Sequence, residues 1–208
     1  MRKLIAIVMM LLPMLAMLTG CKSDEDKVRE TAEAYLYKNM KNPESLKILS
    51  CEIRKDTIPF WLSENMFDLA EKCDKAMDKF NHYKDMSYLF IDEKIESANE
   101  FSSAREALIN AYKYEQQNDS AEIEYVAYVK SSGTNPMGGT VSNSTIVIID
   151  KDNPEKILGS YVVNSDFIGK FAVIKMLGAD YEFKTNKFGK YETEGLPYIE
   201  QFIMNDAE

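Results

Sequence analysis

The chain of 208 residues is poor in the side chains that bind transition metals. It has a single histidine, His82, and three cysteines, Cys21, Cys51 and Cys73. A zinc site needs about four nitrogen, sulfur or carboxylate ligands, and the spacings typical of such sites are missing around His82. No activating base can be named for either of the two later thiols. The sequence therefore predicts no metal centre and no catalytic cysteine.

Motifs of common catalytic and cofactor sites are missing as well. There is no nucleophile elbow and no kinase signature. Gly138-Gly139 lacks the lysine and the spacing of a phosphate loop, and the segment 150–153 lacks the glycine and the distal glutamate of a calcium loop. Glu122 and Glu124 alternate along a strand-like segment, which explains them without acid–base chemistry. We predict no catalytic residue and no cofactor.

An excess of positive charge is also lacking. The formal net charge is -9 at pH 7, and the positive Arg2 and Lys3 lie at the very start of the chain. Such a balance disfavours nucleic acid or an anionic membrane face as the main partner. The hydrophobic share of 45% is ordinary for a globular protein, so a folded chain is expected. Its length favours one core with an elaboration.

The first 20 residues have the pattern of a signal peptide. A positive start, Met1-Arg2-Lys3, precedes a run of about fifteen apolar residues, Leu4–Leu18, that is broken only by Pro13. This run is shorter than the ~20 residues that a membrane-spanning helix needs. We therefore predict a signal peptide over residues 1–20.

The end of this leader, Leu18-Thr19-Gly20-Cys21, resembles the lipobox of bacterial lipoproteins of unknown function. The resemblance implies cleavage before Cys21, whose thiol receives diacylglycerol. Several acyl chains, such as palmitate, would then anchor the protein to a membrane. The alternatives are an ordinary secretory leader with an accidental cysteine and an uncleaved anchor.

An acidic segment, Lys22-Ser23-Asp24-Glu25-Asp26, follows the cysteine. It resembles the export tag of some Bacteroidetes lipoproteins, which implies a location on the outer membrane, at its periplasmic face or at the cell surface. We interpret 21–27 as an acidic tether and 28–208 as a single α+β domain. In addition, Ser23 or Asp24 can cap the first helix.

Cys51 and Cys73 form an even pair in a compartment where disulfides persist. A bond between them would close a loop of ~20 residues and stabilise the fold by roughly 3 kcal/mol. The open alternative is a pair of buried free thiols.

Apolar spacing divides the chain into helices and strands. Helical spacing covers 24–41, about 64–83 and 91–112, while 45–55 alternates as a strand with a bulge. The second and third helices are predicted to pair as a hairpin, an insertion over about 61–117 between the first and second strands. Further strands are predicted at 123–129, 141–149 and 157–163, as an antiparallel meander. The segment 167–177 is ambiguous, and 196–204 predicts a closing helix.

The segments Lys41–Lys47 and Tyr125–Val129, with the Gly-Gly turn and β-branched strand that follow, resemble small exported bacterial proteins of unknown function. The resemblance implies an α+β fold, with an N-terminal helix packed on a curved antiparallel sheet of three to five strands. It carries no catalytic residues.

Aromatic residues gather around the predicted helical insertion, including Phe60, Trp61, Tyr83 and Tyr88. Such side chains suit contact with an envelope protein or a glycan. The alternative is that most of them line the core. The leading hypothesis is a lipid-anchored envelope protein of binding or scaffold type, and the alternative is an envelope hydrolase, or an accessory subunit of an envelope enzyme, that uses dispersed carboxylates.

Overall fold

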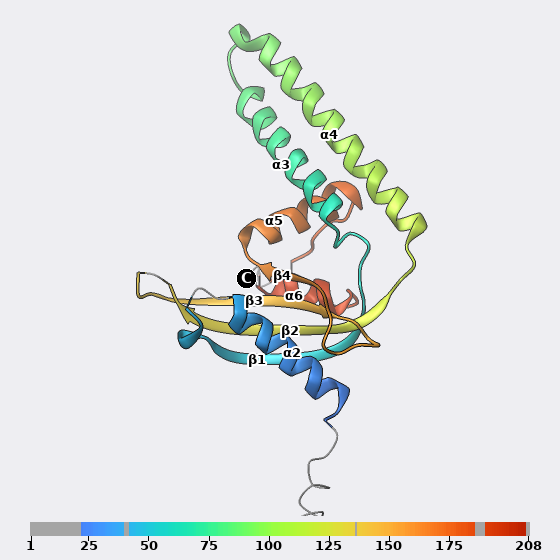
Figure 1. The fold of residues 1–208 in the computed structure, drawn as a ribbon. Helices are drawn as coiled ribbons and strands as arrows, with labels where there is room; N and C mark the ends of the chain where they lie inside the picture. Colours follow the sequence, from blue (N-terminus) through green and yellow to red (C-terminus); the bar gives the residue numbers. More distant parts are fainter. Residues whose placement is uncertain (1–21, 40–41, 136, 186–189, 207–208) are drawn as a thin grey trace, which may run out of the picture.

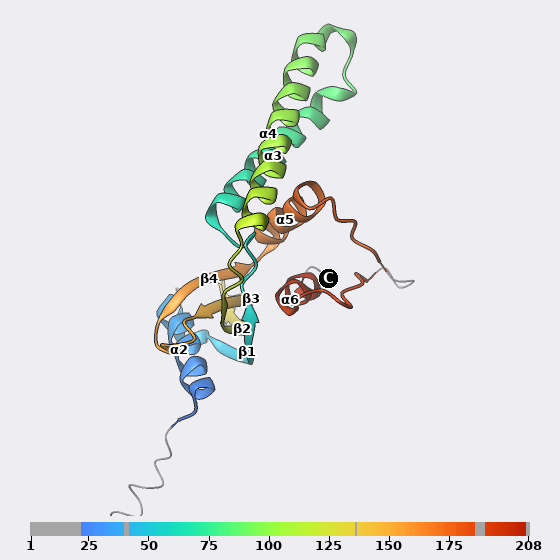
Figure 2. The same cartoon turned by 90° about the vertical axis from the view of Figure 1, so that its right-hand side faces the viewer.

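The computed structural model describes residues 22–39, 42–135, 137–185 and 190–206. The predicted signal peptide and Cys21 therefore lie outside the described residues. The chain has an α+β fold, in which a curved four-stranded antiparallel sheet has helices on both faces (Figures 1 and 2). The strands are β1 (Lys47–Thr57), β2 (Ile123–Thr134), β3 (Thr140–Ile149) and β4 (Ile157–Val163), and their order in the sheet equals their order in the chain. The predicted meander is confirmed.

The register of β1 against β2 shifts between Ile48 and Ser50, at the predicted bulge. Without an extra residue, strict alternation would place Ile48 and Cys51 on opposite faces. The bulge puts both on the face that packs against α2 (Asp24–Asn39), while Leu49 remains exposed. Cys51 is paired with Val129 of β2.

The helix α2 covers one face of the sheet. Its buried residues Val28, Ala32 and Leu36 pack on a cluster that includes Tyr125 and Val147. At its start, the Ser23 hydroxyl accepts from the Asp26 N–H, and the Ser23 N–H donates to the Asp26 carboxylate. This reciprocal cap begins the helix at Asp24, so residues 24–27 of the expected acidic tether are helical.

The remaining helices lie on the opposite side of the sheet. They are α3 (Glu64–Lys84), α4 (Ile91–Asn118), α5 (Ser165–Val173) and α6 (Tyr198–Asp206). The ambiguous segment 167–177 is helical: Asn164 caps α5 by accepting from the Phe167 N–H, and α5 continues into a π-helix, η3 (Ile174–Gly178). A second core of buried residues, including Trp61, Tyr128 and Phe171, fills this side.

Helices α3 and α4 follow one another between β1 and β2 in the chain, pack together and project beyond the sheet (Figure 1). A short 3-10 helix, η2 (Tyr88–Phe90), precedes α4 at their far end. The projecting half is held by stacking of Phe80 on Phe101, with ring centroids 5.8 Å apart, and by Lys79, which pairs with Glu96 and Glu100. No helix in the described ranges has the length and apolarity to cross a membrane.

Candidate functional site

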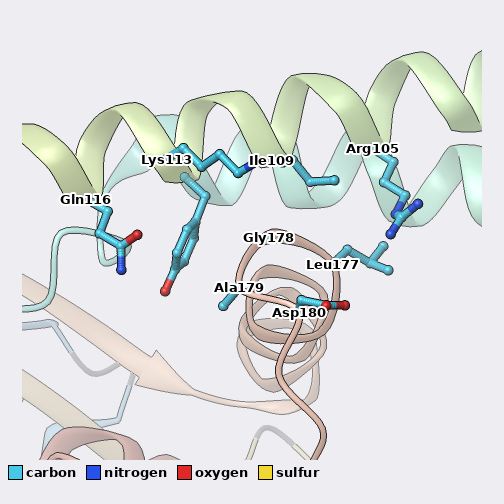
Figure 3. A pocket seen from close by; sticks show the side chains of 9 residues that line it. Arg105, Ile109, Lys113, Gln116, Leu177, Gly178, Ala179 and Asp180 are labelled. Atoms are coloured by element: carbon cyan, nitrogen blue, oxygen red, sulfur yellow. The ribbon is translucent and has the colours of Figure 1, made fainter.

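A cavity of about 440 Å³ lies between α4 and η3 near the base of the projecting helices (Figure 3). We call it the α4–π pocket. Its volume falls within the range of about 300–1,000 Å³ that is usual for small-ligand sites. Its lining comes from two distant segments of the chain: Arg105, Ile109, Tyr112, Lys113 and Gln116 of α4, and Leu177, Gly178, Ala179 and Asp180 at and after η3.

The π-helix shapes one wall of this pocket. The Ala179 N–H donates to the carbonyl of Ile174, five residues earlier, at 3.1 Å. Gly178 then lies directly against the ring of Tyr112, where an added Cβ would be 3.1 Å from a ring carbon. Single turns of π-helix are rare in proteins, and those that occur are often found at functional sites. The close approach of η3 to α4 therefore favours glycine at position 178.

Asp180 lies at the mouth of the pocket in an unusual backbone conformation. Its φ is +53°, in the left-handed region that non-glycine residues rarely adopt. Such a conformation costs of order 1–3 kcal/mol and is held in place by the surrounding structure. Figure 3 shows Asp180 across the gap from Arg105. Within the described residues, the carboxylate of Asp180 forms no hydrogen bond or ion pair.

Two cations line the opposite wall. Arg105 and Lys113 have no hydrogen-bond or ion-pair partner among the residues that the structure describes. The other two described arginines are both engaged: Arg29 donates to the carbonyl of Cys51 at 2.6 Å, and Arg54 pairs with Glu52 at 2.7 Å. The pocket therefore presents two uncompensated cations and one carboxylate to solvent.

A buried ion pair fixes η3 to α6. The Glu200 Oε1 accepts from the Lys175 Nζ at 3.0 Å and from the Trp61 Nε1–H at 3.2 Å. The Glu200 side chain is 4% exposed, and its Oε2 atom has no hydrogen-bond partner among the described residues.

Burial, with a smaller contribution from the Glu200 carboxylate, raises the pKa of the Tyr112 hydroxyl. Tyr112 is therefore neutral at physiological pH.

The aromatic binding candidates do not form one surface. Trp61, one of the four candidates, is 2% exposed and lies in the core with its indole N–H bound to Glu200. The alternative that these aromatics line the core therefore holds for Trp61, and its indole partner Glu200 is distant in the sequence. Phe60 is half-buried against Tyr112, with ring centroids 4.8 Å apart. Only Tyr83 and Tyr88 lie toward the far end of the projecting helices.

That far end carries an exposed apolar surface, which we call the tip: Tyr88, Leu89, Phe90, Ile91 and Ile95. Their exposed fractions are 82%, 73%, 39%, 57% and 56%. Soluble proteins rarely leave a contiguous group of this kind uncovered. The carboxylates of the nearby acids Asp85, Asp92 and Glu93 form no hydrogen bond or ion pair within the described residues. The tip is therefore apolar with an acidic rim.

The cysteine pair is not bonded. Cys51 packs with the cluster under α2, while Cys73 of α3 is buried in the core on the other face of the sheet. The predicted disulfide is wrong because the sheet lies between the two side chains. Burial raises the pKa of both thiols, which disfavours the reactive thiolate.

The remaining candidates have structural surroundings. His82 is exposed beside Tyr83, and no group of three His, Cys, Asp or Glu in the described part of the chain could hold a metal ion. Glu124 is buried and accepts from the Lys151 N–H at 2.6 Å, which fixes a turn. Its carboxylate is therefore explained by the fold.

Comparison with known protein families, with curated proteins and with solved structures gives no match for this chain. The two features from which a function can be argued are therefore the α4–π pocket and the tip. Sequence reasoning reached Tyr88 of the tip and missed Arg105, Lys113 and Asp180. The only sequence signal for the cations was their place on one stripe of a helix, eight residues apart.

Proposed function

We propose that the protein is a lipid-anchored protein of the bacterial cell envelope, attached to the outer membrane through Cys21, that binds an envelope protein through its tip. The lipobox-like segment supports the anchor. The single observation that carries the binding function is the exposed apolar run of the tip. The proposal extends the binding or scaffold hypothesis to a particular surface.

The residue types of the tip suit a protein interface. Burying a side chain such as Leu89 or Phe90 contributes roughly 1.5–3 kcal/mol, so the tip can supply most of the affinity of a small interface. Aromatic residues at the centre of a contact are frequent hot spots, and Tyr88 is the most exposed aromatic residue of the tip. The free acids around it favour a partner groove with basic side chains at its edge and disfavour an anionic lipid surface.

The position of the tip also fits this function. A helix of 28 residues such as α4 is about 42 Å long, and α2 begins at the opposite end of the molecule from the tip (Figure 1). An anchor that precedes α2 would therefore leave the tip directed away from the anchored end. A tethered protein with a distant contact surface can reach a partner that is not held against the same lipid surface.

Photo-crosslinking in living cells tests the tip. A photoreactive phenylalanine analogue replaces Tyr88, and in a matched control it replaces Tyr114, which is 65% exposed on the same helix near its other end. We expect a discrete protein adduct from position 88, weakened when Asp92 and Glu93 are changed to lysine, and none from position 114. Equal adducts at both positions, adducts to lipid alone or no adduct at position 88 would contradict the proposal.

The alternative of an envelope hydrolase, or of an accessory subunit that uses dispersed carboxylates, remains a hypothesis without a specific observation in its favour. Of the two carboxylates considered for it, Glu124 is held against the Lys151 N–H and Glu122 is exposed before β2. These contacts give the pair no shared site.

A further inference from the structure

We propose that the α4–π pocket is a second, separate binding site, which takes a small dicarboxylate that also carries an amino group, the chemistry of a free acidic amino acid. The inference uses no residue of the tip. It rests on the charges, the shape and the rigidity of the pocket.

The two cations of the pocket indicate that the ligand carries two anionic groups. Arg105 and Lys113 are eight residues apart on α4, a rise of about 12 Å, with Ile109 between them. In Figure 3 the Lys113 side chain runs along the helix toward Ile109, and Arg105 points toward Leu177. Two carboxylates on one short aliphatic chain can therefore each meet a cation. The Arg105 guanidinium offers two parallel N–H donors, which match a carboxylate.

Asp180 indicates that the ligand also carries a third group, which is positively charged. Its carboxylate lies across the gap from Arg105 and is unpaired within the described residues. In a pocket that attracts anions, an unpaired carboxylate would repel a simple dicarboxylate. A ligand with an ammonium group turns this repulsion into an ion pair. One acid opposite two cations therefore selects an amino dicarboxylate over a plain one.

The pocket is also preorganised for a ligand. Contact between Gly178 and Tyr112 fixes the distance between η3 and α4, and the buried Lys175–Glu200 pair attaches η3 to α6. The apolar side chains of Ile109 and Leu177 line the space between the charged groups, where a short aliphatic chain fits. A wall held rigid before binding loses little entropy when the ligand enters.

Equilibrium dialysis with radiolabelled L-glutamate tests the site, using the full chain purified in a nonionic detergent. We expect saturable binding of one L-glutamate per chain, at millimolar affinity or tighter. Succinate, which lacks the amino group, and L-glutamine, which lacks the second carboxylate, should each compete at least tenfold more weakly. Inorganic phosphate should not compete at equal ionic strength.

Matched variants test which pocket residue binds which group of L-glutamate. Arg105→Gln and Lys113→Gln should each weaken L-glutamate binding about tenfold and reduce its preference over L-glutamine. Asp180→Asn should reduce the preference for L-glutamate over succinate. The control is Lys72→Gln, which removes an exposed lysine of α3 outside the pocket and should change nothing. Circular dichroism melting shows whether each variant is folded.

Three results would overturn the inference. One is the absence of saturable L-glutamate binding by the folded wild-type chain. Another is competition by phosphate as strong as that of L-glutamate, which would define a simple anion site. The last is binding by folded Arg105→Gln or Lys113→Gln that equals binding by Lys72→Gln.

Discussion

At the scale of single residues, the contact between Gly178 and the ring of Tyr112 is a sharp test of the pocket. A Cβ at position 178 would lie 3.1 Å from a ring carbon, and the ring cannot move far because Tyr112 is 8% exposed. We predict that Gly178→Ala destabilises the protein by about 1–3 kcal/mol through overpacking. Equilibrium unfolding in urea measures the effect.

Gly169→Ala is the matched control for this substitution. Gly169 lies within α5, and an added Cβ there would meet nothing within 4 Å. Alanine is the better helix former by about 1 kcal/mol, so this variant should be as stable as the wild type or more stable. Equal destabilisation by both substitutions would show that the approach of η3 to α4 is not tight.

Other residues have contacts that cannot be predicted from the sequence, because their partners are distant along the chain. Trp61 stands in a break between elements, and nothing nearby in the sequence indicates that its N–H bonds to Glu200, 139 residues away. Arg105 and Asp180 line the same pocket only because η3 packs on α4. Pockets made by distant segments leave no local pattern, whereas Tyr88 was found because aromatic residues gather visibly around the predicted helical insertion.

At the scale of elements, an ion pair connects α3 to α5. The Glu71 carboxylate pairs with Lys75 at 2.5 Å and with Lys170 of α5 at 3.0 Å, and these two lysines hold its pKa at about 2, against an ordinary value of 4.5. A lowered carboxyl pKa contributes stability that is fully present above pH 4.5 and is lost as the pH falls toward 2. Because the Glu71 side chain is 42% exposed, solvent and salt weaken this contribution.

We predict that Lys170→Met raises the pKa of Glu71 toward its ordinary value while Lys75 retains part of the shift. Carbon-13 NMR titration of the side-chain carboxyl, assigned with Glu71→Gln, measures the midpoint directly. Lys72→Met, which removes a neighbouring lysine outside this pair, should leave the midpoint in place. A midpoint near 4.5 in the wild-type protein would mean that α5 and α3 are not joined in this way.

Elements with strong periodicity were predictable almost to the residue. The helix expected at 64–83 is Glu64–Lys84, and the strand expected at 157–163 is Ile157–Val163. The bulge of β1 could also be predicted, because Ile48 and Cys51 change the phase of the alternation. The π-helix could not, since its shifted hydrogen bonds follow from packing of η3 on α4 and leave no trace in the spacing of apolar residues.

At the scale of the whole molecule, the predicted anchor is open to a direct test. Cys21 lies outside the described residues, and the proposal for it depends on the lipobox-like sequence. We predict that Cys21→Ala moves the protein from the membrane fraction to the soluble fraction of cell lysates, because several acyl chains are lost. Fractionation with an immunoblot, and intact mass of the wild-type protein, measure this.

Cys51→Ala is the control for that experiment, because Cys51 is a half-buried free thiol and its loss should leave the protein on the membrane. Continued pelleting of a Cys21→Ala protein that carries no lipid would exclude the thioether as the source of attachment. A wild-type mass without acyl chains would exclude it as well.

The position of the α4–π pocket, at the base of a helix of 28 residues, has a mechanical consequence. The part of α4 between Tyr112, at this pivot, and Ile91, at the far end, is about 32 Å long, so a tilt of a few degrees where α4 meets η3 would displace the far end by about 2–3 Å. Because contact between Gly178 and Tyr112 fixes this pivot, the same contact sets the direction in which Tyr88 and Leu89 of the tip point.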